Sequence, residues 1–128
     1  MKIKYLGETT NGKVIHLFDF SNDEVMEIKT LIDEMAEGKI NRIAMHEHAL
    51  VNARDNDHLT LRLGHENQGI LYNNQNKEFT CALTKVGYEN MSELILSFAE
   101  HSLEMEGFEW LDETGDVSLL ISPSKRWE

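Results

Sequence analysis

The sequence has almost no cysteine or proline, with one of each in 128 residues. Because Cys81 has no second cysteine to pair with, an intramolecular disulfide and a metal site built on several cysteines are both excluded. The chain also has no internal repeat and no linker rich in proline, glycine or serine, and domains most often contain about 100–150 residues. We therefore expect residues 1–128 to fold as a single globular domain.

Long apolar runs and several common binding motifs are missing as well. No run approaches the roughly 18 apolar residues that span a bilayer, and residues 1–6 lack the apolar core of a signal peptide. We therefore expect a cytoplasmic protein that does not bind membranes. The glycine-rich phosphate-binding motifs and the G-x-S-x-G motif of serine hydrolases do not occur either, so the sequence indicates no cofactor.

Basic residues are few, with 12 lysines and arginines against 23 aspartates and glutamates and a formal net charge of −11. A protein that binds nucleic-acid phosphates needs a basic face, so we expect no nucleic-acid partner. The acids are also unevenly distributed. Residues 89–116 contain nine acids and no lysine or arginine, and residues 21–37 contain six acids and one lysine, whereas residues 38–88 contain five acids and six bases. The negative charge is therefore concentrated in two segments.

The first of these segments carries the signals of an amphipathic helix over residues 21–37. Ser21 can cap its start, with Glu24 reaching back as the second half of a capping box, and Phe20 and Val25 hold the positions of a hydrophobic staple. Gly38 supplies the left-handed residue that ends many helices. Apolar residues recur at helical spacing and define the face that should be buried: Val25, Ile28, Leu31, Ile32, Met35 and Ala36.

A second amphipathic helix is predicted over residues 90–104, with Asn90 and Glu93 closing its start and Gly107 ending it. Its apolar stripe consists of Met91, Leu94, Ile95, Phe98 and Ala99. Alternating apolar residues and turn signals predict eight short strands, over residues 2–6, 13–19, 42–47, 58–63, 69–72, 78–84, 108–111 and 117–122. Residues 48–57 are polar and are expected to form a surface loop.

The resulting element order, ββα ββββ α ββ, indicates an α+β fold. Short turns join neighbouring strands, so most strand pairs should be antiparallel. We expect a mostly antiparallel, curved sheet of about eight short strands, with both amphipathic helices packed on one face. A doubly wound parallel fold requires helices that alternate with single strands, and this chain lacks that order.

His46 and His48 are the candidate metal ligands. Side chains repeat every two residues along a strand, so on an extended segment both histidines point to the same face. Such a pair can bind Zn²⁺ or another transition metal when a third ligand arrives from elsewhere, and His16, His58 and His65 are candidates for that ligand. The alternative is that His46 and His48 are ordinary polar residues at the end of a strand.

The sequence singles out no catalytic residue. Cys81 alternates with Phe79 and Leu83, which places its side chain on the expected core face. A catalytic thiol needs exposure and a nearby base, and nothing local provides either. With 23 acids in the chain, carboxylate pairs suited to acid–base chemistry arise by chance, so none can be chosen. We therefore favour a binding protein over an enzyme.

The concentrated acids favour a non-catalytic protein-binding module, of the inhibitor or immunity type, that masks a basic surface on another protein. If both helices lie on one side of the sheet, their outer faces form one negative surface. The residues expected to contact the partner are Glu27, Glu34, Glu37, Glu93, Glu100 and Glu104. The hypothesis fails if these carboxylates are scattered, or are neutralised by Arg42, Arg54 and Arg62.

Other interpretations stay open. Glutamate-rich helix faces also arise from solvation and helix propensity alone. The chain could instead be a small-ligand-binding or metal-binding domain, or an enzyme, that uses the strand end at His46 and His48. A third alternative is a homodimeric structural accessory protein, so both a monomer and a homodimer are compatible with the sequence. Trp127, near the C-terminus, is expected to dock in a groove of its own domain.

Overall fold

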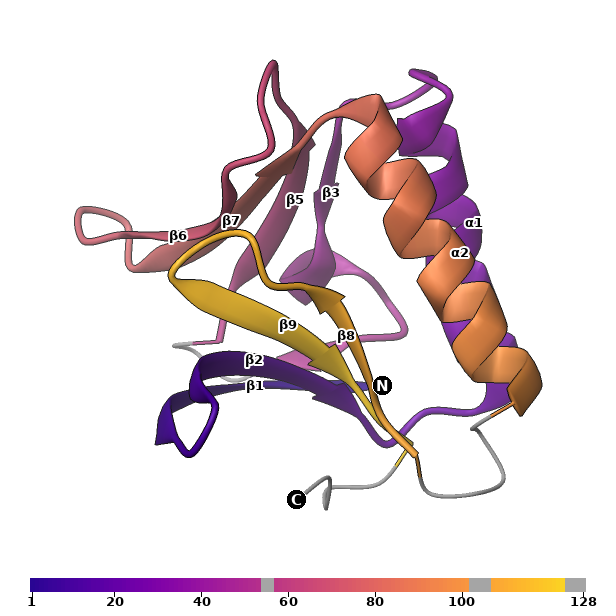
Figure 1. The fold of residues 1–128 in the computed structure, drawn as a ribbon, viewed down its shortest axis with the longest axis horizontal. Coiled ribbons are helices and arrows are strands. Elements are labelled where there is room, and N and C mark those ends of the chain that lie inside the picture. Colours follow the sequence, from indigo (N-terminus) through magenta and orange to yellow (C-terminus); the bar gives the residue numbers. More distant parts are fainter. Residues whose placement is uncertain (54–56, 102–106, 124–128) are drawn as a thin grey trace.

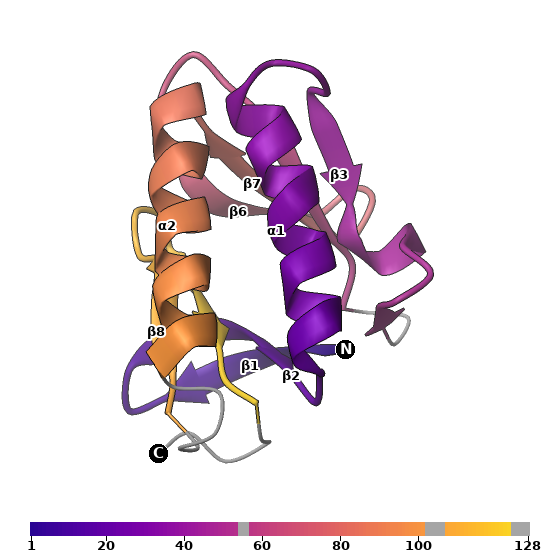
Figure 2. The same ribbon diagram turned by 90° about the vertical axis from the view of Figure 1, so that its right-hand side faces the viewer.

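The computed structural model describes residues 1–53, 57–101 and 107–123, and these residues form an α+β fold with both helices on one side of a curled sheet (Figures 1 and 2). The strands are β1 Lys2–Thr9, β2 Gly12–Phe18, β3 Arg42–Ala44, β4 Asn52–Ala53, β5 Leu59–Leu63, β6 Gly69–Asn73, β7 Glu78–Leu83, β8 Glu109–Asp112 and β9 Val117–Ile121. The helices are α1 Asn22–Ala36 and α2 Lys85–His101, and a 3₁₀ helix, η1, spans Met45–Glu47. The predicted α+β class, curved sheet and helix pair are confirmed.

The sheet is mixed and curls into a half-barrel (Figure 1). Its strand order is β3-β5-β7-β6-β9-β2-β1-β4, and β8 pairs with β9 outside this path. Five of the strand pairs are antiparallel, whereas β1–β4, β2–β9 and β5–β7 are parallel. Most pairs are therefore antiparallel, as predicted. The parallel pairs join strands far apart in the sequence, and short turns between neighbouring strands cannot reveal such pairs.

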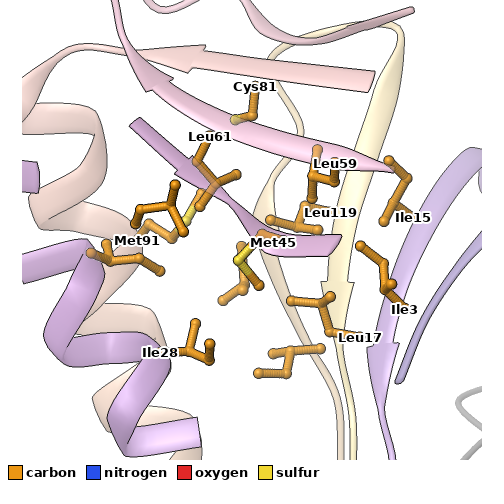
Figure 3. Close-up of a cluster of buried hydrophobic side chains, with 14 of the residues drawn as sticks. Ile3, Ile15, Leu17, Ile28, Met45, Leu59, Leu61, Cys81, Met91 and Leu119 are labelled. Carbon is orange, nitrogen blue, oxygen red and sulfur yellow. The ribbon is translucent and has the colours of Figure 1, made fainter. Parts of the chain in front are cut away.

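Apolar side chains from the inner face of the sheet and from both helices fill the half-barrel (Figure 3). Ten of them, each at most 3 % exposed, are Ile3, Ile15, Leu17, Ile28, Met45, Leu59, Leu61, Cys81, Met91 and Leu119. Burial of a large apolar side chain contributes about 1.5–3 kcal/mol, so this cluster is the main source of the fold's stability. Tyr5 and Phe79, whose rings lie 4.6 Å apart, connect β1 with β7 across the half-barrel.

Helix α1 begins and ends at the predicted residues. The Ser21 side chain accepts a hydrogen bond from Glu24 N at 3.2 Å, and Ser21 N donates to Glu24 Oε1 at 2.9 Å, so both halves of the capping box form. Glu24 Oε2 also accepts a 2.8 Å hydrogen bond from the N-terminal ammonium of Met1, and this bond lowers the pKa of Glu24 to about 2. Gly38 follows the helix with a φ of +79°.

Helix α2 begins five residues earlier than predicted. Thr84, not Asn90, caps it: Gly87 N donates to Thr84 Oγ1 at 3.2 Å, and Tyr88 N donates to Thr84 O at 3.0 Å. Gly87 lowers the helix propensity of this turn, but its site has no room for a side chain. A Cβ there would lie 2.6 Å from Asn67 Oδ1, which accepts hydrogen bonds from Thr84 N and Thr84 Oγ1. A tertiary contact therefore explains the glycine.

The strand predicted over residues 42–47 is shorter than expected. β3 ends at Ala44, and η1 follows it. Met45 enters the core at 1 % exposure, but the turn prevents His46 and His48 from projecting from one face of a strand, so that prediction is wrong. β4 lies within the predicted loop and pairs with β1.

Gly69 and Gly115 bring two backbone segments into direct contact. Gly69 has a φ of +72°, and a Cβ on it would lie 2.3 Å from Gly115 N. A Cβ on Gly115 would in turn meet Ile70 O at 2.7 Å. The start of β6 therefore packs against the β8–β9 turn through two residues that lack side chains.

Neither described helix is long and apolar enough to cross a membrane. Arg54, Glu104 and Trp127, which the sequence analysis named, lie outside the described residues. The docking of Trp127 on its own domain therefore stays a prediction.

Candidate functional site

The helices α1 and α2 lie side by side on one side of the molecule (Figure 2). We define the acidic helix layer as their exposed or half-buried acids Asp23, Glu27, Glu34, Glu89, Glu93 and Glu100. Four of the six predicted contact residues belong to this layer. Of the other two, Glu37 lies just after α1, where its Oε2 forms a 2.7 Å ion pair with Lys39 Nζ, and Glu104 is not described.

Basic residues do not balance this layer. The two helices contain eight acids and two bases, whereas the other described residues contain 11 acids and seven bases. Of the two helix bases, Lys29 binds Asp33, with Nζ 2.8 Å from Oδ2. The other, Lys85, lies beside Gly38, since a Cβ built on Gly38 would be 2.9 Å from Lys85 Nζ. The Lys85 ammonium is therefore at the C-terminal end of α1, where the helix dipole favours a cation.

The arginines that could have neutralised the layer lie on strands. Arg42 and Arg62 face each other in register on β3 and β5, and both side chains are exposed. Among the described residues, neither arginine forms an ion pair with a helix carboxylate. The acidic segment after α2 continues into β8, which contacts α2 (Figure 2). The two acidic segments of the sequence are therefore neighbours in space.

A polar contact ties the two helices together beneath this surface. Ser92 on α2 is buried and donates a short hydrogen bond to Asp33 Oδ1 on α1. Partial burial of Asp33 would raise its pKa, but the hydrogen bonds from Lys29 and Ser92 outweigh burial, so the pKa of Asp33 is lowered. The charged carboxylate thus fixes the helices relative to each other.

A second candidate site lies where β3 ends and where β5 and β7 begin. Potential ligand atoms of His46, His58 and Glu78 all lie within 4.8 Å of one another. The rings of His46 and His58 stack with centroids 4.2 Å apart and planes 6° apart. His58 Nδ1 lies 3.8 Å from Glu78 Oε1. All three residues are half-buried, so the cluster is structured but open to solvent.

The structure separates His48, His16 and His65 from this cluster. His48 Nδ1 accepts a 3.1 Å hydrogen bond from Leu50 N. His16 is buried on β2, where its Nε2 lies 2.6 Å from Ser122 Oγ and burial lowers its pKa to about 4. His65 is exposed and follows β5. Of the residues weighed as ligands, only His46 and His58 come together, and Glu78 joins them.

The thiol of Cys81 lies in the core, as its alternation predicted. Burial raises the pKa of Cys81 to about 12, and the charge of Asp112 adds to this effect. The neighbouring Tyr88 side chain is also buried, and its hydroxyl oxygen lies 2.7 Å from Arg62 O and 2.9 Å from Cys81 O. The hydroxyl proton is therefore shared between two backbone carbonyls. The Cys81 thiol and the Tyr88 hydroxyl therefore contact each other and the backbone within the core.

A third feature is a cavity of about 880 Å³ at the open end of the half-barrel. Figure 1 shows the β1–β2 and β6–β7 hairpins projecting on the same side of the molecule, away from the helices. The cavity lies between them and is lined by Tyr5, Lys13, Leu71, Tyr72, Asn74, Lys77, Phe79, Asp116 and Val117. The rings of Tyr5, Phe79 and Tyr72 form a row, with adjacent centroids 4.6 and 4.8 Å apart.

Sequence reasoning missed Glu78 and the cavity. Glu78 comes next to His58 because β5 and β7 pair in parallel, and no local pattern specifies that pairing. The cavity depends on the curl of the sheet. Three comparisons with known proteins add no further guide, because no family model, curated protein or solved structure matches this chain.

Proposed function

We propose that the chain is a non-catalytic protein-binding module whose acidic helix layer covers a basic surface on a partner protein. The observation that carries this proposal is the side-by-side placement of two helices with eight acids and only two bases. A concentrated negative field raises the association rate of a cationic partner by one or more orders of magnitude at low salt. It also repels nucleic acid and anionic membranes.

An inhibitor or immunity-type protein of the cytoplasm fits this design, because it acts by masking a basic site instead of performing chemistry. The charge of the layer defines the class of the partner, a basic protein. An exposed apolar side chain on the same helix adds apolar contact, since Leu96 on α2 is 37 % exposed. Binding through charge at the rim and apolar atoms between the charges is typical of protein interfaces.

The test uses two charge-reversal variants of equal net charge. Glu27→Lys with Glu93→Lys changes the acidic helix layer, and Glu47→Lys with Glu66→Lys changes two exposed acids outside α1 and α2. Each immobilised protein is exposed to lysate of the source cells at about 50 mM and about 500 mM salt. We expect a basic protein to be retained at low salt by the wild type and by the second variant, and to be lost from the first variant.

Retention of no basic protein at low salt contradicts the proposal, and so does equal retention by the two variants. The hypothesis that the chain is an inhibitor adds a further requirement. The retained protein must lose its own activity when the wild type is added, and must keep it when the helix-layer variant is added.

The cavity favours a second candidate function, the binding of a small aromatic anion. The rings of Tyr5 and Tyr72, which pack against the buried Phe79, offer apolar surface to an aromatic ligand. Lys13 and Lys77 can face its acidic group, and Asp116 is the one carboxylate among the lining residues. The fluorescent aromatic sulfonate 1-anilinonaphthalene-8-sulfonate is a suitable probe. We expect Tyr72→Ala and Lys77→Ala to reduce its binding and Leu96→Ala, on α2, to leave it unchanged. Equal binding by all four proteins would exclude the cavity as the site.

A homodimer through a sheet edge is the remaining alternative. In the described sheet the strands paired on one side only, β3, β4 and β8, contain three, two and four residues, which leaves little edge for pairing. Sedimentation equilibrium tests this alternative directly.

A further inference from the structure

We propose that His46, His58 and Glu78 form a binding site for a divalent transition metal, with Zn²⁺ as the best match. This site is independent of the proposed function, because it uses none of the residues of the acidic helix layer. Two imidazoles and one carboxylate form a common ligand set for Zn²⁺, whereas Mg²⁺ and Ca²⁺ prefer oxygen ligands alone. Three protein ligands leave a fourth tetrahedral position for water.

Three strand ends produce this arrangement. β5 and β7 run parallel with Leu59 opposite Phe79, so His58, which precedes β5, and Glu78, the first residue of β7, are neighbours. A 2.9 Å hydrogen bond from Phe79 N to His58 O fixes that alignment. β3 runs antiparallel to β5 with Ala44 opposite Thr60, so the chain beyond Ala44 reaches the level of His58. The ligands therefore come from elements that the sheet holds in place.

The backbone also selects the tautomer of His46. Its Nδ1 lies 3.2 Å from Leu59 O. A carbonyl oxygen can only accept, so Nδ1 carries the proton and Nε2 keeps its lone pair. A metal-bound histidine usually donates its second ring nitrogen to a carbonyl or carboxylate in this way, and that bond orients the ring.

Metal binding requires a small adjustment of the ligands. Ligand atoms about 2.1 Å from a tetrahedral ion lie about 3.4 Å apart, whereas these atoms are separated by up to 4.8 Å. The ring planes of His46 and His58 are also nearly parallel, so at least one ring must turn before a nitrogen of each can bind the same ion. The side chains of His58 and Glu78 are 35 % and 31 % exposed, so they have room to turn toward a shared ion.

The test is calorimetric titration of the full chain with zinc chloride, together with the absorption spectrum of bound Co²⁺. We expect one ion per chain. His58→Gln and Glu78→Gln are expected to weaken binding more than about 100-fold, since changes even in residues that only support a ligand weaken metal sites about 10–100-fold. His48→Gln removes a nearby histidine outside the cluster and should change affinity less than about threefold.

Circular dichroism and thermal unfolding without metal show whether each variant is folded. If His58→Gln does not fold, the metal affinity of Glu78→Gln tests the ligand set. The absence of heat and of Co²⁺ bands in the wild type would overturn the site. Loss of binding in His48→Gln with retention in His58→Gln and Glu78→Gln would overturn the ligand set. Because these readouts need no partner protein, they are separate from the test of the proposed function.

Discussion

The helix side and the sheet side of this molecule differ in charge and in how their contacts are built. The two helices contain eight acids and two bases, and local contacts such as the Ser21 cap and the Lys29–Asp33 ion pair shape them. The sheet side holds the histidine cluster and the aromatic cavity, and it depends on contacts such as that between Gly69 and Gly115. One side therefore offers a charged surface, and the other holds the histidine cluster and the aromatic rings.

The largest expected effect tests the dependence of the sheet side on distant contacts. Gly69→Ala places a Cβ 2.3 Å from Gly115 N at a φ of +72°, and the backbone of Gly115 cannot move aside cheaply. We expect the free energy of unfolding to fall by about 3–5 kcal/mol. Urea denaturation followed by tryptophan fluorescence measures this change.

Gly12→Ala is the matched control for that substitution. Gly12 has a φ of +85°, but a Cβ there would meet nothing within 4 Å. Its cost should therefore be that of the left-handed backbone alone, about 1 kcal/mol. Equal costs at Gly12 and Gly69 would show that the backbone contact with Gly115 does not matter.

The next effect is a pH dependence that His16 gives to the sheet side. Burial lowers the pKa of His16 to about 4 from an ordinary value of 6.5, so below pH 6.5 the unfolded chain binds a proton that the folded chain does not. Stability therefore falls as pH drops from 6.5 toward 4. Between pH 7 and pH 5 we expect a loss of about 2 kcal/mol from this residue.

Comparison with His16→Gln isolates the contribution of His16. The variant removes the titrating group, so its unfolding free energy should change less than that of the wild type between pH 7 and pH 5. His65→Gln, at an exposed position, should follow the wild type. A His16→Gln profile identical to that of the wild type would show that His16 is not held neutral by burial.

A smaller effect is expected on the helix side from the local cap at the start of α1. Ser21→Ala removes one half of the capping box and should cost about 1 kcal/mol. Glu24, the other half, has a pKa lowered to about 2, chiefly by its hydrogen bond with the N-terminal ammonium. Its contribution is present above pH 4.5 and is lost as the pH falls toward 2. Thermal unfolding at pH 7 and at pH 3 measures both effects. A loss in Ser21→Ala larger than that in Gly69→Ala would reverse the comparison between the two sides.

The smallest effect concerns the acidic helix layer itself. Glu27 is exposed on α1, and it forms no ion pair with any side chain in the described part of the protein. Glu27→Lys should change the free energy of unfolding by less than about 0.5 kcal/mol at moderate salt. A loss above about 1 kcal/mol would mean that this carboxylate serves the fold instead of a partner.

The same division explains what could be predicted from the sequence. The start and the end of α1 are predictable because Ser21, Glu24 and Gly38 act within one helical turn, and its buried face is predictable because apolar residues recur at helical spacing. The predicted start of α2 is five residues late, because Gly87 weakens the local helix signal. A glycine is present there because a side chain would collide with Asn67, which lies 20 residues away in the sequence. Local patterns report local contacts well and tertiary contacts poorly.

The candidate sites follow this rule too. The charge of the helices is a property of composition and was predictable, and their adjacency followed from the α+β fold. His46 was recognised as a ligand and His58 as an option, but the partner carboxylate of Glu78 depends on the parallel register of β5 and β7. His48 shares a face with His46 only on a continuous strand, and η1 interrupts that strand.

Paramagnetic relaxation of backbone amides by a cationic and an anionic nitroxide of equal size most directly tests whether negative potential is gathered on the helix side. At low salt we expect the cationic probe to be enriched over the anionic one more strongly at α1 and α2 than at β3 and β5. This difference should shrink as salt is raised to about 500 mM. Equal enrichment over helices and strands would contradict the segregation of charge, and with it the proposal that the acidic helix layer binds a basic protein.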